Sequence, residues 1–153
     1  MPELRYNMIS REWVVIATER AKRPKDFKKV SQEAKPLPGY KKECPFCPGN
    51  ESESEAETFR MGDEKAWSVR VVPNKFPALS SQEKPTRKIE GDYVSMRGFG
   101  IHEVIVEHPR HNAIISLMTD AEVGDIIRTY RARYISIRKT KGIEAIYNAP
   151  CTS

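Results

Sequence analysis

The sequence contains no long apolar segment, so it predicts no membrane-spanning helix. Its first five residues include no apolar stretch of the kind that a secretory signal requires. Cysteine is scarce. The chain has 3 cysteines, an odd number that does not suit a scaffold of paired disulfides. Together these absences predict a cytoplasmic protein without a disulfide framework.

The chain also lacks the patterns of common nucleic-acid-binding folds. Its 26 basic and 21 acidic residues give a net charge of +5, and a basic surface suits nucleic acids and phosphorylated metabolites alike. The sequence shows no RNA-recognition motif and no helix-turn-helix pattern. Its basic residues are not interleaved with exposed aromatic residues, as single-strand binders require. A nucleic-acid partner is therefore not expected.

Length and hydrophobic pattern predict one α+β domain. A chain of 153 residues is large enough for one core. Short β-branched apolar runs predict strands over residues 13–17, 101–107 and 143–147, and an alternating pattern predicts another over 67–72. The 11 prolines and many polar residues indicate long connections, at residues 20–40 and 79–92.

A long helix is predicted from Thr119 to Thr140. Thr119 and Glu122 fit a capping box at its start, and Gly142 fits a break after its end. Apolar residues then recur on one face at helical spacing: Val123, Ile126, Ile127, Tyr130, Tyr134 and Ile137. The expected fold is a mainly antiparallel sheet with this helix packed on it.

Two cysteines form a Cys-x-x-Cys turn at Cys44 and Cys47, in the run Cys-Pro-Phe-Cys-Pro-Gly-Asn. Thiolates at this spacing can converge on one tetrahedral metal ion. His111, in a loop after a predicted strand, is the favoured third ligand. Water, His108 and Cys151 are the candidates for the fourth position. The alternative interpretation is that the thiols are free and the histidines are surface residues.

Two further segments could contact a phosphorylated ligand. The first consists of Arg20, Ala21, Lys22 and Arg23. Its three cations are close together, and guanidinium groups suit bidentate phosphate recognition. The second is the proline-flanked turn at Asn74 and Lys75, which could present Asn74 to a base or a sugar. A solvated basic loop and an ordinary turn are the plainer alternatives.

These motifs occur in an order that resembles one enzyme family. The ordered runs are Arg5-Tyr6-Asn7 and the residues 20–24, 44–51, 70–79 and 100–107. They resemble galactose-1-phosphate uridylyltransferase and close relatives such as ADP-glucose phosphorylase, which belong to the histidine-triad superfamily. The resemblance extends to about Asn148 and matches the N-terminal half of the family's usual length.

The resemblance implies a fold, a cofactor and ligands. It implies a histidine-triad-like half-barrel over residues 1–148, followed by a divergent tail at 149–153. It implies zinc held by Cys44, Cys47 and His111. It implies substrate contacts from Arg20, Ala21, Lys22, Arg23, Asn74, Lys75 and Asn148. The implied substrates are UDP-glucose or ADP-glucose and a hexose 1-phosphate, since the family transfers a uridylyl group from UDP-glucose to galactose 1-phosphate. The resemblance also implies a second copy of the chain as a partner.

One element of the family is missing from the sequence. In the family, a His-Pro-His motif follows the strand that ends near Asn148. Its first histidine is the fourth zinc ligand, and its second is the nucleophile that carries the nucleotidyl group. Here Asn148 is followed by Ala-Pro-Cys-Thr-Ser, and no His-x-His pair occurs. We therefore expect a truncated or frameshifted family member or a fragment, with no catalytic residue and no covalent nucleotidyl intermediate in this chain alone.

Two alternatives to a uridylyltransferase stay open at this point. One is an adenylyl-transferring enzyme like ADP-glucose phosphorylase, because no residue clearly selects uracil over adenine. The other is a non-catalytic, zinc-stabilised module that binds nucleotides.

Overall fold

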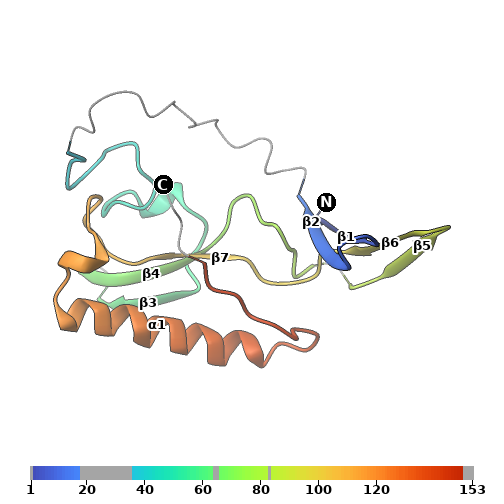
Figure 1. Cartoon of the computed structure of the whole chain (residues 1–153). Coiled ribbons are helices and arrows are strands. Elements are labelled where there is room, and N and C mark those ends of the chain that lie inside the picture. The colour runs from blue at the N-terminus through green and yellow to red at the C-terminus, as the bar shows by residue number, and fades with distance from the viewer. Residues whose placement is uncertain (1, 18–35, 64–65, 83, 150–153) are drawn as a thin grey trace.

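The computed structural model describes residues 2–17, 36–63, 66–82 and 84–149 (Figure 1). These residues form two antiparallel sheets and one long helix. The four-stranded sheet has the order β2-β1-β6-β5, and the three-stranded sheet has the order β3-β4-β7. Two short 3-10 segments, at Glu51–Glu53 and Ile115–Leu117, lie in the connections. The α+β class and the antiparallel pairing expected from the sequence are confirmed, although the strands form two sheets where one was expected.

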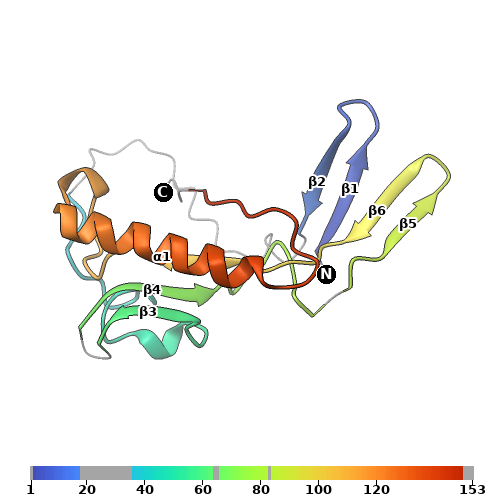
Figure 2. The ribbon, with the colours of Figure 1, turned by 90° about the horizontal axis from the view of Figure 1, so that it is seen from below.

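The four-stranded sheet consists of two hairpins that pair along β1 and β6. Its strands are β1 (Glu3–Asn7), β2 (Glu12–Ile16), β5 (Arg87–Glu90) and β6 (Tyr93–Arg97). The first hairpin turns at Asn7, whose side-chain oxygen accepts a hydrogen bond from the amide of Ile9 at 2.9 Å. Figure 2 shows both hairpins projecting away from the helix. Apolar side chains such as Val14 and Ile89 are therefore largely exposed.

The three-stranded sheet contains most of the buried core. Its strands are β3 (Phe59–Gly62), β4 (Trp67–Pro73) and β7 (Glu103–Val106). The central strand β4 buries side chains on both faces, including Val69, Val71 and Val72. A central strand with this burial is typical of a sheet that is covered on both faces.

The helix α1 (Asp120–Arg138) packs on β3 and β4, where it buries Ile126 completely. Arg133 also ties the helix to β7, because its guanidinium donates two hydrogen bonds to Glu103, at 2.7 and 2.9 Å. The capping box predicted from the sequence is present, with Thr119 and Glu122 hydrogen bonding each other reciprocally. Among the residues that the structure describes, no helix is long and apolar enough to cross a membrane.

The helix cap makes stability depend on pH. Hydrogen bonds from the Thr119 amide, from His108 and from the Thr119 hydroxyl lower the pKa of Glu122 from 4.5 to about 2. A carboxylate with a depressed folded pKa stabilises the protein above its unfolded pKa and loses this effect as pH falls through the folded pKa. We expect Glu122→Gln to destabilise the protein at pH 7, by an amount that shrinks between pH 4.5 and about 2.

Urea unfolding at several pH values, followed by circular dichroism, measures this difference. Asp120→Asn is the control, since Asp120 is an exposed acid in the same first turn. A Glu122→Gln effect that stays constant from pH 7 to pH 2 would contradict the assignment.

Two secondary-structure predictions are wrong. Residues 143–147 were expected to form a strand, but the structure has no strand there, and Tyr147 is 90% exposed. This segment instead runs beside the end of α1, where it lines a cavity with Tyr134 and Arg138. The expected loop over 79–92 contains β5, whose four residues are all exposed. A strand without a buried face leaves no hydrophobic alternation in the sequence.

Candidate metal centre and ligand-facing residues

Cys44, Cys47 and His111 converge in the structure. Their ligand atoms all lie within 4.8 Å of one another, and Cys47 Sγ is 3.5 Å from His111 Nδ1. Cys47 is buried, whereas Cys44 and His111 are half-buried. Cys44 and Cys47 are free cysteines rather than a disulfide. These three side chains can hold a metal ion.

The two cysteines are presented by successive tight turns. The amide of Cys47 donates to the carbonyl of Cys44 at 3.2 Å, and the amide of Asn50 donates to the carbonyl of Cys47 at 3.1 Å. Gly49 has a φ of 89°, a conformation that a residue with a Cβ atom rarely adopts. The run Cys-Pro-Phe-Cys-Pro-Gly-Asn therefore folds back on itself and directs both sulfur atoms to one side.

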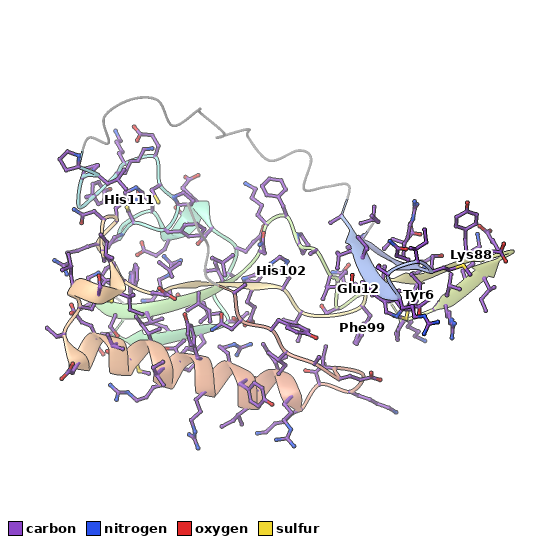
Figure 3. The ribbon with its side chains drawn as sticks, in the orientation of Figure 1. Tyr6, Glu12, Lys88, Phe99, His102 and His111 are labelled. Carbon is purple, nitrogen blue, oxygen red and sulfur yellow. The ribbon has the colours of Figure 1, made fainter. Side chains whose placement is uncertain are left out.

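His111 reaches the cysteine turn because its loop is tied to the segment before the turn. The amide of His111 donates to the carbonyl of Gly39 at 2.8 Å, and the Asn112 side chain donates to the carbonyl of Leu37 at 3.0 Å. These two hydrogen bonds hold residues that are far apart in the sequence side by side. Figure 3 shows His111 above the three-stranded sheet, in the region of the cysteine turn.

One separation in this cluster matches a tetrahedral zinc site. In a tetrahedral site with Zn–S near 2.3 Å and Zn–N near 2.1 Å, sulfur and nitrogen ligands are about 3.6 Å apart. The observed separation of Cys47 Sγ and His111 Nδ1 is 3.5 Å. Cys47 Sγ also accepts a hydrogen bond from the Lys41 amide at 3.4 Å. Burial raises the pKa of the Cys47 thiol, and the Lys41 hydrogen bond opposes that shift.

His108, a candidate for the fourth ligand, is directed elsewhere. Its Nδ1 accepts a hydrogen bond from the Arg110 amide at 2.9 Å. Its Nε2 lies 2.9 Å from a carboxylate oxygen of Glu122, at the start of α1. Since both ring nitrogens have partners outside the cluster, His108 supports the helix start rather than the metal position.

Asn74 and Lys75 lie in a turn directly after β4. His102 organises this turn, because its carbonyl accepts from the Asn74 amide at 2.9 Å and its Nδ1 accepts from the Ala78 amide at 2.8 Å. The Asn74 side chain lies 3.2 Å from His102 Nε2 and accepts from the Phe76 amide at 2.9 Å. Lys75 is exposed. The sequence gave no sign that Asn74 and His102 are partners.

Asn148 lies apart from the Asn74 turn. It hydrogen bonds Tyr130 of α1, whose hydroxyl also donates to Glu107. Burial and then Glu107 raise the pKa of Tyr130 to about 12, and the Asn148 hydrogen bond acts in the opposite direction. Glu107 follows the end of β7, whereas His102 precedes its start. The structure therefore places Asn148 and Asn74 at opposite ends of this strand.

Five of the candidate residues named from the sequence are not among the described ones. Arg20, Ala21, Lys22, Arg23 and Cys151 lie outside the described residues.

The site also contains residues that the sequence did not indicate. Glu51 and Arg70 connect the cysteine turn to β4, and Arg70 is 1% exposed. An arginine within an apolar run was the only signal that could have identified this connection.

The fold and the cluster define an α+β domain, with antiparallel sheets and one packed helix, in which two cysteines and a histidine can hold a metal ion. The family described as galactose-1-phosphate uridyl transferase, N-terminal domain, matches residues 1–147. This chain therefore belongs to the galactose-1-phosphate uridyl transferase family, as the resemblance implied.

Curated and solved relatives agree with this assignment. ADP-glucose phosphorylase from Arabidopsis thaliana is 36% identical and covers 94% of this chain. Galactose-1-phosphate uridylyltransferase from Haemophilus influenzae is 29% identical and covers 85%. The crystal structure of the Arabidopsis thaliana ADP-glucose phosphorylase with bound ADP-glucose superposes with a TM-score of 0.54, at 32% identity over 94% of this chain and 40% of that one. The chain spans 44% and 36% of the lengths of the two curated relatives.

Proposed function

We propose that this chain is a zinc-stabilised domain that binds the nucleotide sugar for a nucleotidyl transfer between sugar phosphates. The observation that carries the proposal is the convergence of Cys44, Cys47 and His111 in a chain of this family. Zinc, when bound, supplies a cross-link between the cysteine turn and the loop after β7. Thiolate and imidazole ligands are the donors that structural zinc sites use.

The chain's own residues would bind and orient the nucleotide sugar. Arg20, Lys22 and Arg23 would neutralise its phosphates, because guanidinium groups match phosphate oxygens in a bidentate geometry. Asn74, held by His102, would contact the nucleoside, with Lys75 beside it at the surface. Positioning and charge stabilisation supply most of the catalysis in phosphoryl transfer. These residues would therefore perform the binding part of the reaction.

ADP-glucose is the ligand that we favour over UDP-glucose. The chain is 36% identical to an ADP-glucose phosphorylase and 29% identical to a galactose-1-phosphate uridylyltransferase. The relevant experiment is isothermal calorimetry with each nucleotide sugar. We expect a measurable heat with both and tighter binding of ADP-glucose. Tighter binding of UDP-glucose would support the uridylyl-transferring alternative instead.

Replacing Arg23 tests whether the basic segment contacts the phosphates. A hydrogen bond to a charged group contributes about 1.5–3 kcal/mol, so we expect Arg23→Ala to weaken ADP-glucose binding by about tenfold or more. Arg131→Ala is the control, since Arg131 is an exposed arginine on α1. Equal, negligible heats with both nucleotide sugars would contradict the proposed nucleotide site. Identical binding by Arg23→Ala and the wild type would contradict the phosphate contact of Arg23.

A further inference from the structure

One carboxylate connects the cysteine turn to the central strand of the three-stranded sheet. Glu51 Oε2 accepts a hydrogen bond from the Gly49 amide at 2.8 Å, two residues after Cys47. Glu51 Oε1 accepts from the indole nitrogen of Trp67, the first residue of β4, at 3.0 Å. Each oxygen atom therefore has a different partner, one in the turn and one in the sheet.

Arg70 holds this carboxylate from inside the protein. Its guanidinium lies 3.8 Å from Glu51 Oε1 and 5.3 Å from the centre of the Trp67 ring. The same guanidinium donates to Ser54 Oγ at 2.9 Å and to Glu57 Oε2 at 3.2 Å. The segment after the cysteine turn thus wraps around one buried cation of β4. A buried charge with several partners fixes the geometry of the groups around it.

Both metal-binding segments are attached to β4. Glu51 attaches the cysteine turn to Trp67 and Arg70 of this strand. His111 follows β7, which pairs with β4 in register from Arg70–Val106 to Pro73–Glu103. The distance between the sulfur atoms and His111 Nδ1 therefore depends on how firmly each segment is held on one strand.

We propose that Glu51 is a positioning residue of the metal centre. Through Gly49 it fixes the turn so that the sulfur atoms of Cys44 and Cys47 stay within reach of an ion bound to His111. This inference rests on the proposed zinc site. Partners of metal-binding groups commonly change metal affinity by about 10–100-fold when they are removed.

The side chain at position 51 has to be a carboxylate for a simple reason. Two N–H donors, from Gly49 and Trp67, each bond a different one of its oxygen atoms. A carboxylate accepts both, whereas a glutamine amide has one accepting oxygen and two donor hydrogens. Glu51→Gln therefore breaks one of the two connections, and Glu51→Ala breaks both. The metal affinity should therefore be lower in Glu51→Gln than in the wild type, and lower again in Glu51→Ala.

Cobalt(II) is the probe that separates positioning from general stability. The 153-residue chain is titrated with cobalt(II), and the visible ligand-field and thiolate charge-transfer bands are recorded. Zinc affinity is then measured by competition with a chromophoric chelator. We expect about tenfold weaker binding for Glu51→Gln and about 100-fold weaker binding for Glu51→Ala, with shifted bands in both. Glu53→Gln is the matched control, because Glu53 is an exposed acid in the same 3-10 segment.

The outcomes distinguish this inference from the zinc site itself. A wild type that binds neither metal would overturn the proposed site. A wild type that binds cobalt, with Glu51 variants of equal affinity and identical bands, would overturn the positioning role alone. Trp67→Phe removes the indole donor together with part of the buried ring and keeps a ring for Arg70, so it serves if the Glu51 variants do not fold. Several-fold weaker binding with shifted bands in Trp67→Phe supports the inference, and wild-type binding overturns it.

Discussion

The Cys47→Ala protein is expected to lose tight zinc binding. Cys47 is the buried member of the cluster, and its sulfur lies 3.5 Å from His111 Nδ1. Structural zinc sites contribute roughly 10–16 kcal/mol of binding free energy at neutral pH. One ligand's share of this is about 3 kcal/mol, so we expect the zinc affinity to fall by about 100-fold or more.

Elemental analysis and competitive zinc titration of the purified proteins measure this effect. A chelator should lower the melting temperature of the wild type and leave that of Cys47→Ala unchanged, because bound metal stabilises the folded state. Cys151→Ser is the comparison variant, because it removes the third cysteine, a candidate fourth ligand, and keeps all three side chains of the cluster; we expect it to lose less zinc affinity than Cys47→Ala. Equal zinc content in Cys47→Ala and the wild type, or no zinc uptake by the wild type, would show that the cluster is not a zinc site.

The Ile126→Ala protein is expected to show a large decrease in the free energy of unfolding. Ile126 is 0% exposed and lies on the face of α1 that packs on the three-stranded sheet. Truncating a buried isoleucine to alanine removes apolar contact and leaves a cavity, at a cost of about 2–5 kcal/mol. In a domain with a small core this is a large part of the free energy of unfolding.

The adjacent residue supplies a matched control. Ile127 has the same side chain on the same helix but is 57% exposed. Surface substitutions usually change stability by less than about 0.5 kcal/mol, so Ile127→Ala should stay close to the wild type. Urea unfolding followed by circular dichroism gives both values. Similar losses for the two variants would mean that α1 does not pack on the sheet through Ile126.

The sequence allowed predictions wherever the decisive interactions are local. The capping box joins Thr119 to Glu122, three residues away, and it predicted the start of α1 correctly. The strand over 67–72 was recognised because apolar residues alternate along it, a pattern that is local to the segment. The strands β1, β3, β5 and β6 were not recognised. Exposure leaves strands such as β5 without a periodic apolar pattern.

The metal centre shows the same division between local and distant information. The spacing of Cys44 and Cys47 was visible in the sequence, because two sulfur atoms at this spacing can meet in one turn. The sequence favoured His111 as the third ligand, but only the fold showed that His108 is directed away from the cluster. A hydrogen bond with Glu122 orients the His108 ring towards the start of the helix. A hydrogen bond to the carbonyl of Gly39 holds His111 beside the cysteine turn.

By itself, the sequence determined the family, the helix, the central strand and the cysteine pair. Each of these depends on residues a few positions apart, whose chemistry is the same whatever surrounds them. Only the tertiary structure decided that residues 143–147 form no strand and that Glu51 is paired with Trp67 and Arg70. A hydrogen bond between segments that are distant in sequence exists only once the chain has packed, because packing alone brings its donor to its acceptor.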